Sequence, residues 1–244
     1  MSEQQELDGL TALVTGATSG IGRATAEELA RHGADVVVHG RNAAQGAAVV
    51  NGITAEGGTA RFAAADLGDP AGPGELVEQA GSVDVLVNNA GFAWHGPTAD
   101  IDEATFDELF AANVRAPYFL VGALAPKMAA RGGGSIINVG SEAGQIGLAN
   151  AAAYSATKGA LASMTRSWAA EFSPAGVRVN TVAPGPVYTA IQSHDESDAL
   201  GASTPMSRAA QPDEIAEVIA FLASPKASYI TGAVVAADGG RTAV

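Results

Sequence analysis

The chain has 244 residues, a net charge of -13 and a hydrophobic fraction of 47%. An acidic surface of this kind repels nucleic acids and anionic membranes, which excludes both as partners. The absence of cysteine excludes disulfides and cysteine metal sites and favours a cytoplasmic location. No apolar run is long enough to span a membrane. The length suits one α/β domain, which we place at residues 7–244, after a loose polar tail at residues 1–6.

The N-terminal region predicts a βαβ unit. An apolar run at 10–15 reads as a buried strand, a helical pattern extends from the glycine-rich stretch to Leu29, and residues 36–38 form the next strand. Backbone N–H groups of a glycine turn at a helix start can bind a phosphate. The alternative is a glycine turn without a ligand. The residues predicted to hold a dinucleotide here are Gly16, Thr18, Ser19, Gly20, Ile21 and Gly22.

The end of the second strand indicates the cofactor. Sites selective for NAD place a carboxylate there, whereas this chain has Gly40 followed by Arg41. A guanidinium at this point suits the 2′-phosphate of NADP. Arg41 also lies beside a helix start capped by Asn42, where an unpaired cation is mildly unfavourable. We therefore expect NADP(H) to be preferred and NAD(H) to be the alternative, unless Arg41 is only a solvated loop residue.

The remaining elements alternate along the chain. Strands are predicted at 60–65, 83–87, 135–141, 176–182 and 233–236, and helices at 43–56, 70–81, 103–112, 114–130, 154–172 and 213–223. This alternation predicts an α/β doubly wound Rossmann fold with a seven-stranded, mostly parallel sheet and helices on both faces. Residues 190–207 lack clear periodicity, so we expect an irregular lid over the ligand edge.

Small and polar residues follow several predicted strands. Asp66, before Leu67, can accept from an adenine amino group, or it can simply begin a turn. The stretch 88–91, Asn-Asn-Ala-Gly, lacks bulk and lets a cofactor lie against the backbone. Ser141 ends the fifth strand. Ligands in open α/β sheets bind beyond the carboxyl ends of the strands, so these groups are expected at one edge.

Tyr154 and Lys158 are four residues apart on a predicted helix and therefore share one face. An ammonium beside a phenol favours the phenolate, so Lys158 is expected to lower the pKa of Tyr154. The tyrosine could then act as a general acid and base near neutral pH. In isolation the Tyr-x-x-x-Lys pattern is weak, because it also recurs on solvated helices.

Four motifs occur in order on the expected elements: residues 15–22, residues 88–91, Ser141 with the stretch 154–158, and Pro184-Gly185 before Thr189. In this combination the chain resembles the short-chain dehydrogenase/reductase family over residues 7–244. The resemblance implies that Tyr154 protonates a carbonyl oxygen that Ser141 holds. It implies a water positioned by Asn113 and a proton relay through Lys158. The cofactor contacts that it implies, besides those above, are Asn89, Ala90, Gly91, Tyr154, Lys158, Pro184, Gly185, Val187 and Thr189.

The substrate is less defined by the sequence. The stretch 92–96 does not look like that of 3-oxoacyl-carrier-protein reductases, which weakens a fatty-acid substrate. An apolar pocket around Ser141 is expected, with ordinary packing as the alternative for each wall residue. His95 is expected to be a solvated loop residue, His32, His39 and His194 to be incidental, and no spacing suggests a metal. The predicted walls are Trp94, Tyr188, Ile191 and Met206.

The sequence thus predicts an NADP(H)-dependent carbonyl reductase or alcohol dehydrogenase for a small or medium, mostly apolar substrate. The alternatives are a 3-oxoacyl-type reductase, a related lyase or epimerase that retains its cofactor, and a nucleotide-sensing regulator without turnover. The resemblance also implies a homo-oligomer, with a tetramer favoured over a dimer.

Overall fold

The computed structural model describes residues 5–189 and 193–244. Its centre is one seven-stranded sheet in the order β3-β2-β1-β4-β5-β6-β7, and every pairing among these strands is parallel. This confirms the predicted doubly wound, single-domain fold. The order of the strands reverses between β1 and β4, which is where open α/β sheets bind their ligands. The strands are β1 (Thr11–Val14), β2 (Asp35–Gly40), β3 (Thr59–Ala64), β4 (Val85–Asn88), β5 (Gly134–Val139), β6 (Val177–Pro184) and β7 (Val234–Ala237).

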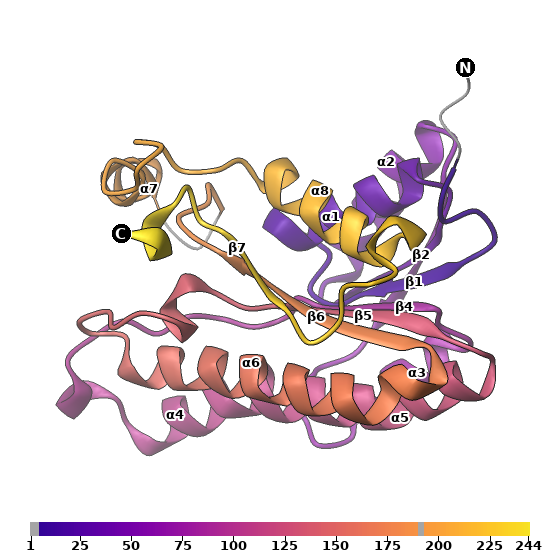
Figure 1. Cartoon of the computed structure of the whole chain (residues 1–244), viewed down its shortest axis with the longest axis horizontal. Coiled ribbons are helices and arrows are strands. Elements are labelled where there is room, and N and C mark those ends of the chain that lie inside the picture. Colours follow the sequence, from indigo (N-terminus) through magenta and orange to yellow (C-terminus); the bar gives the residue numbers. More distant parts are fainter. Residues whose placement is uncertain (1–4, 190–192) are drawn as a thin grey trace.

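Helices cover both faces of the sheet (Figure 1). One layer contains α1 (Gly20–Arg31), α2 (Ala43–Ala55) and α8 (Pro212–Ala223), and the other contains α3 (Gly72–Ala80), α4 (Glu103–Phe110), α5 (Ala116–Ala130) and α6 (Ala152–Phe172). Leu29, Ile53 and Ile219 lie in the core of the first layer, and Leu120 and Leu161 in that of the second. Each such side chain contributes about 1.5–3 kcal/mol when fully buried, so the two cores fix the strand ends that carry the site.

The two helices predicted at 103–130 are joined without a break. A π-helical segment, Ala111–Arg115, links α4 to α5, and Asn113 in this segment is buried. The extra residue per turn of a π-segment changes which side chains face inward, and such segments recur at functional sites. Sequence reasoning located the irregularity at Asn113 but read it as a boundary between two helices.

The expectation of an irregular segment at 190–207 is wrong for residues 194–201 and holds for residues 202–207. Residues His194–Gly201 form helix α7, which begins with a capping box of Ser193 and Glu196. Ser-x-x-Glu is a helix-start signal that satisfies two backbone N–H groups at once, and it could have been read from the sequence. Residues 202–207 form turns after it. Ile191 lies outside the described residues, and closure of this segment as a lid stays a prediction.

The expected N-terminal tail is described only at its end, from residue 5. Glu6 forms an ion pair with Lys226, in a 3-10 turn that follows α8. Among the described residues, no helix is both long and apolar enough to cross a bilayer.

Candidate active site

A cavity of about 750 Å³ opens at the carboxyl ends of β1, β2 and β4, at the reversal of strand order. Its lining contains most of the residues predicted to bind the cofactor. Tyr154, Lys158, Pro184, Gly185 and Val187 are not part of that lining. The predicted residues that do line the cavity are Gly16, Thr18, Ser19, Gly20, Ile21, Gly22, Arg41, Asp66, Leu67, Asn89, Ala90, Gly91 and Thr189.

The glycine turn fits a dinucleotide phosphate. Gly16 has a φ of 63°, and a Cβ on Gly22 would lie 2.3 Å from the carbonyl oxygen of Gly16, so neither position accepts a side chain without movement. The N-cap of α1, Ser19, makes no side-chain capping bond. The first N–H groups of α1 therefore remain for an anion at the positive end of the helix.

Asn89 and Thr15 hold the turn in place. The amide Nδ2 of Asn89 donates to the carbonyl oxygens of Thr15 and Gly16, at 2.8 and 3.1 Å. The hydroxyl of Thr15 accepts from the backbone N–H groups of Asn89 and Ala90, both at 2.9 Å. The end of β4 and the turn after β1 are thus one bonded unit before any ligand binds.

His39, which sequence reasoning set aside as incidental, is part of this unit. It is buried at the end of β2, where Nδ1 accepts from the N–H of Gly16 at 3.1 Å and Nε2 lies 3.2 Å from the carbonyl oxygen of Ala65. Burial lowers its pKa to about 4, so the ring is neutral and its Nε2–H donates to Ala65. The only available sequence signal was its position, two residues before Arg41 at a strand end.

Arg41 directly follows β2, lines the cavity and is exposed. Asn42 caps α2 as predicted, accepting from the N–H groups of Ala44 and Gln45 at 3.0 and 3.1 Å. Asp66 uses Oδ1 to accept from the N–H of Gly68 at 2.9 Å, which is the turn role offered as its alternative. A second guanidinium that sequence reasoning missed, Arg115, also lines the cavity and donates to the carbonyl oxygen of Gly68.

The structure brings Ser141, Tyr154 and Lys158 together. Ser141 follows β5, and its hydroxyl is close enough to Tyr154, on the first turn of α6, to lower the pKa of that phenol. The ammonium of Lys158 lies 5.6 Å from the centre of the tyrosine ring. It donates to the carbonyl oxygen of Val139 at 2.8 Å, which ties α6 to the end of β5.

The electrostatics of this group differ from the expectation. Burial raises the pKa of Tyr154, against a lowering by the bond to Ser141, and the charge of Glu142 raises it further. Burial also lowers the pKa of Lys158 to about 8. Lys158 is not among the causes that shift the pKa of Tyr154, and burial, the largest of them, raises it, so the expected lowered pKa is not found in the protein alone.

Asn113 has partners on both sides of the site. Its Oδ1 accepts from the N–H of Phe92 at 3.1 Å, and its Nδ2 donates to the carbonyl oxygen of Phe92 at 2.9 Å and to Thr157 at 3.1 Å. Thr157 in turn donates to the carbonyl oxygen of Tyr154 at 2.7 Å. The π-segment thus connects the loop after β4 to the helix turn of Tyr154. The water expected at Asn113 stays a prediction.

The predicted substrate residues that the structure describes, Trp94, Tyr188 and Met206, do not form a single apolar wall. Tyr188 is turned toward α7, where its hydroxyl donates to Asp198 and its ring stacks on His194 at 5.2 Å. Met206 is 60% exposed, and Trp94 packs against Gly96. His95 instead lies edge-on to the ring of Tyr154, with 5.8 Å between ring centres. His95 is nevertheless exposed, as expected of a loop residue.

One cluster away from the cavity has ligand-type groups. Glu28, His32 and Glu217 bring one donor atom each within 4.8 Å of one another, from α1 and α8. Glu28 is already engaged, with Arg31 and with Nε2 of His32 at 3.0 Å. The i and i+4 spacing of Glu28 and His32 was visible in the sequence, and the structure gives it a hydrogen-bond contact.

Comparisons with known proteins agree with this geometry. The family model described as enoyl-(acyl carrier protein) reductase matches residues 16–242. A solved short chain dehydrogenase/reductase family protein is 50% identical, with a TM-score of 0.92, over 98% of this chain and 100% of that chain.

Two further relatives have defined names. The cis-4-hydroxycyclohexanecarboxylate dehydrogenase of Sinomonas cyclohexanicum is 40% identical over 96% of both chains. The gluconate 5-dehydrogenase of Burkholderia cenocepacia J2315, solved with NADP and tartrate, is 32% identical with a TM-score of 0.92, over 99% of this chain and 98% of that chain. The protein therefore belongs to the short-chain dehydrogenase/reductase family of oxidoreductases.

Proposed function

We propose that the protein transfers a hydride between NADP(H) and the carbonyl or secondary alcohol carbon of a small to medium, mostly apolar substrate. The observation that carries the proposal is the grouping of Ser141, Tyr154 and Lys158 at the same carboxyl edge of the sheet as the cavity that the glycine turn lines. A hydroxyl pair at this edge can hold a carbonyl oxygen and supply its proton. The secondary alcohol named for the Sinomonas relative is of the same chemical class.

In the direction of reduction, NADPH when bound supplies the hydride that the carbonyl carbon accepts. Ser141 donates a hydrogen bond to the carbonyl oxygen as negative charge develops on it. Tyr154 transfers its phenolic proton to that oxygen, so the product is a neutral alcohol. Lys158 stabilises the tyrosinate that remains, and the proton is then restored from solvent. In the direction of oxidation, the tyrosinate accepts the alcohol proton as general base.

The assay is NADPH consumption with a panel of ketones, and NADP+ reduction with alcohols that include cis-4-hydroxycyclohexanecarboxylate. Tyr154→Phe should lower kcat by about 10²–10⁴-fold, because it removes the proton donor and leaves the ring. Tyr188→Phe is the matched control, since that hydroxyl is bonded to Asp198. Full activity in Tyr154→Phe would overturn the mechanism.

The preference for NADP(H) rests on Arg41, at the end of β2, and on NADP in the Burkholderia structure. A charge-assisted hydrogen bond contributes about 1.5–3 kcal/mol. Arg41→Ala should therefore weaken NADPH binding roughly 10- to 100-fold while NADH binding changes little. Arg23→Ala, which breaks only the pair with Glu27, is the control. An unchanged ratio of NADPH to NADH affinity would assign the preference elsewhere.

A 3-oxoacyl-type reductase is the second candidate, because a solved protein described as a putative betaketoacyl-ACP reductase is 50% identical to this chain. Faster turnover of a 3-oxoacyl thioester than of any free ketone would establish it. Tight NADPH binding without reduction of either class would favour a regulator. Product formation without net NADPH consumption would mark a lyase or epimerase.

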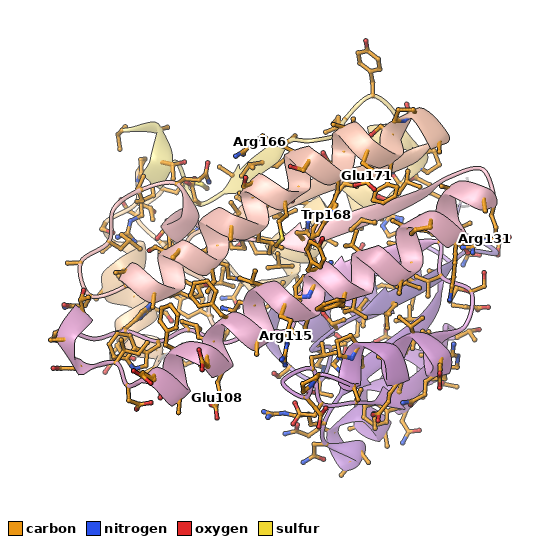
Figure 2. All side chains as sticks on the ribbon, turned by 90° about the horizontal axis from the view of Figure 1, so that it is seen from below. Glu108, Arg115, Arg131, Arg166, Trp168 and Glu171 are labelled. Atoms are coloured by element: carbon orange, nitrogen blue, oxygen red, sulfur yellow. The ribbon has the colours of Figure 1, made fainter. Side chains whose placement is uncertain are left out.

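We also propose a cytoplasmic homo-oligomer, with a tetramer favoured. Figure 2 shows the face formed by α4, α5 and α6, with Arg115 and Trp168 among its side chains. Tyr118 and Phe119 on this face are 52% and 56% exposed, and a hollow of about 470 Å³ lies beside them. Phe119→Glu should shift sedimentation toward smaller species, whereas Phe221→Glu on α8 should not. Identical sedimentation of both variants and the wild type would exclude this face as the interface.

A further inference from the structure

Glu142 is a buried carboxylate that the proposed reaction does not use. It follows Ser141 directly and begins a 3-10 turn, η3 (Glu142–Gly144), between β5 and α6. Its side chain is 8% exposed, and Oε2 has no hydrogen-bond partner. A buried acid with a bare oxygen is costly unless a charge compensates it. This position therefore requires a partner.

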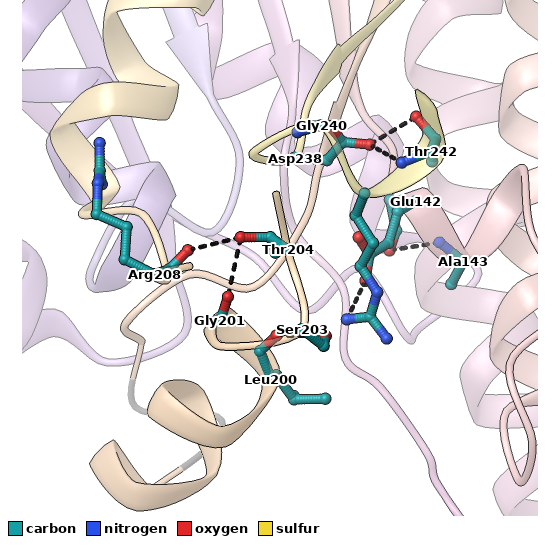
Figure 3. Close-up of polar contacts among 12 residues, drawn as sticks. Glu142, Ala143, Leu200, Gly201, Ser203, Thr204, Arg208, Asp238, Gly240 and Thr242 are labelled. Carbon is teal, nitrogen blue, oxygen red and sulfur yellow. Dashed lines mark hydrogen bonds and ion pairs between the residues drawn. The ribbon is translucent and has the colours of Figure 1, made fainter. Parts of the chain in front are cut away.

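The partner is Arg241 near the C-terminal end, whose Nη1 lies 3.0 Å from Oε1 of Glu142. Arg241 begins the 3-10 turn η6 (Arg241–Ala243), and its side chain is 19% exposed. Asp238 builds the turn ahead of it. Its carboxylate accepts from the N–H of Gly240 at 2.9 Å, and from the N–H and hydroxyl of Thr242 at 2.9 and 2.6 Å (Figure 3). The carboxylate of Asp238 is thus bonded within the turn, whereas the guanidinium of Arg241 pairs with Glu142.

This C-terminal turn, residues 238–243, also contacts two other parts of the catalytic edge. A Cβ on Gly185 would lie 2.8 Å from Cα of Asp238, so the loop after β6 presses directly on it. Met206, in the segment after α7, donates its N–H to the carbonyl oxygen of Gly239 at 3.1 Å. The ion pair therefore links the loop after β5 to both neighbouring segments.

The carboxylate of Glu142 interacts electrostatically with Tyr154. Burial raises the pKa of Glu142, Arg241 lowers it, and the charge of Asp238 raises it. The charge of Glu142 in turn raises the pKa of Tyr154, after burial itself. Within the described part of the chain, Lys158 on α6 and His95 on the loop after β4 also face that ring, and Ser141 lowers the tyrosine pKa. An uncompensated Glu142 would therefore oppose loss of the tyrosine proton.

We propose that Glu142 and Arg241 form a positioning pair, in which the C-terminal turn delivers a cation that neutralises the carboxylate behind Ser141 and Tyr154. The pair holds the start of η3 and fixes how much negative charge the tyrosine experiences. It acts through Tyr154 and Ser141 and contacts neither substrate nor cofactor. This inference rests on the proposed function for its kinetic readout.

The first test is the pH profile of kcat/KM for oxidation of the best secondary alcohol of the panel with NADP+. Activity rises with pH as Tyr154 becomes a base. Glu142→Gln removes the anion and leaves the cation, so the midpoint should move to lower pH by roughly 1 unit. Arg241→Met leaves the anion, which is ionised where tyrosine titrates, so the midpoint should move to higher pH. The double variant should return close to the wild-type midpoint.

Arg241→Lys keeps the cation and should keep the wild-type profile if it folds. A merely structural pair predicts that both single variants lose stability and kcat with unmoved midpoints. Shifts in one direction for both variants, or no shift in either, overturn the proposal. If one of the two single variants fails to fold, the other decides the proposal by the direction of its own shift, and an unmoved midpoint in it overturns the pair.

A second readout does not depend on turnover. The ultraviolet absorbance of tyrosinate, taken as the difference between each protein and its Tyr154→Phe counterpart, reports Tyr154 alone. The same opposed shifts are expected in it. Without alcohol or ketone turnover in the wild type the proposed function fails, whereas opposed tyrosinate shifts would still uphold the pair. Turnover with unmoved tyrosinate midpoints would overturn the pair and leave the proposed function standing.

Discussion

The ligand edge of the sheet has two halves, which differ in the kind of polar group that they bury. The half built on β1, β2 and β4 uses neutral groups, Thr15, His39 and Asn89, which are bonded to backbone atoms. The half built on β5, η3 and α6 buries ionisable groups, Lys158 and Glu142. The first arrangement adds rigidity at little electrostatic cost. The second keeps charges out of water, which destabilises the fold but tunes proton transfer.

The comparison separates the buried polar groups that stabilise the fold from those that destabilise it. A buried neutral group with its bonds made can be lost only at a cost to stability. A buried charge needed for chemistry can be replaced with a gain in stability and a loss of activity. Substitutions in the two halves should therefore separate stability from turnover in opposite ways.

Lys158→Met is the strongest way to break this contrast. Activity should fall by about 10²–10⁴-fold, as for loss of a proton-transfer group. Burial lowers the pKa of Lys158 from 10.5 to about 8, so the folded state disfavours the ammonium. The destabilisation is full below pH 8 and disappears as pH rises to 10.5, where the unfolded chain also loses the proton. The wild type should thus gain up to about 3 kcal/mol over this range relative to the variant.

Urea unfolding of both proteins between pH 7 and 11 measures that difference. Lys127→Met, on the exposed side of α5, is the control and should show the pH slope of the wild type. If the difference in unfolding free energy between Lys158→Met and the wild type stayed constant across this range, burial would not lower the pKa of Lys158.

Much of this contrast was accessible from the sequence. Strand and helix order followed from apolar periodicity, and the glycine turn and the spacing of Tyr154 and Lys158 located both halves of the cleft. The direction of the tyrosine pKa was missed, because spacing places a cation nearby but carries no information on desolvation. His39 and Arg241 were missed for a related reason. Their partners, Gly16 and Glu142, lie 23 and 99 residues away in the chain, and only the folded topology brings them together.

His39→Asn tests the neutral half. Burial lowers the pKa of His39 to about 4 from 6.5, so the stability that the neutral ring provides is complete above pH 6.5 and is lost as pH falls toward 4. Asparagine keeps an acceptor near the N–H of Gly16 and does not titrate. The variant should lose less stability than the wild type over this interval, by up to about 3 kcal/mol.

Thermal or urea unfolding between pH 7 and 4 gives the two slopes, from which the common carboxylate contribution cancels. His32→Asn is the matched control, because that ring is partly exposed beside Glu28. Parallel acid curves for His39→Asn and the wild type would show that folding does not change the pKa of His39.

The smallest expected effects come from two helix N-caps, one on α2 and one on α7. Asn42 caps α2, which buries Val49 and Ile53, and Ser193 caps α7, whose buried residues are Ser197 and Gly201. Replacing either cap by alanine costs about 1 kcal/mol in its helix. Because α2 is packed into the core, Asn42→Ala should lower global stability by that amount.

Ser193→Ala should instead speed amide hydrogen exchange within α7 and leave the global unfolding midpoint unchanged, since α7 contributes little apolar burial to the fold. The two measurements together report whether α7 opens independently of the rest of the fold. A global loss of about 1 kcal/mol in Ser193→Ala would make α7 as much a part of the cooperative fold as α2, and would remove the physical basis for its predicted closure as a lid.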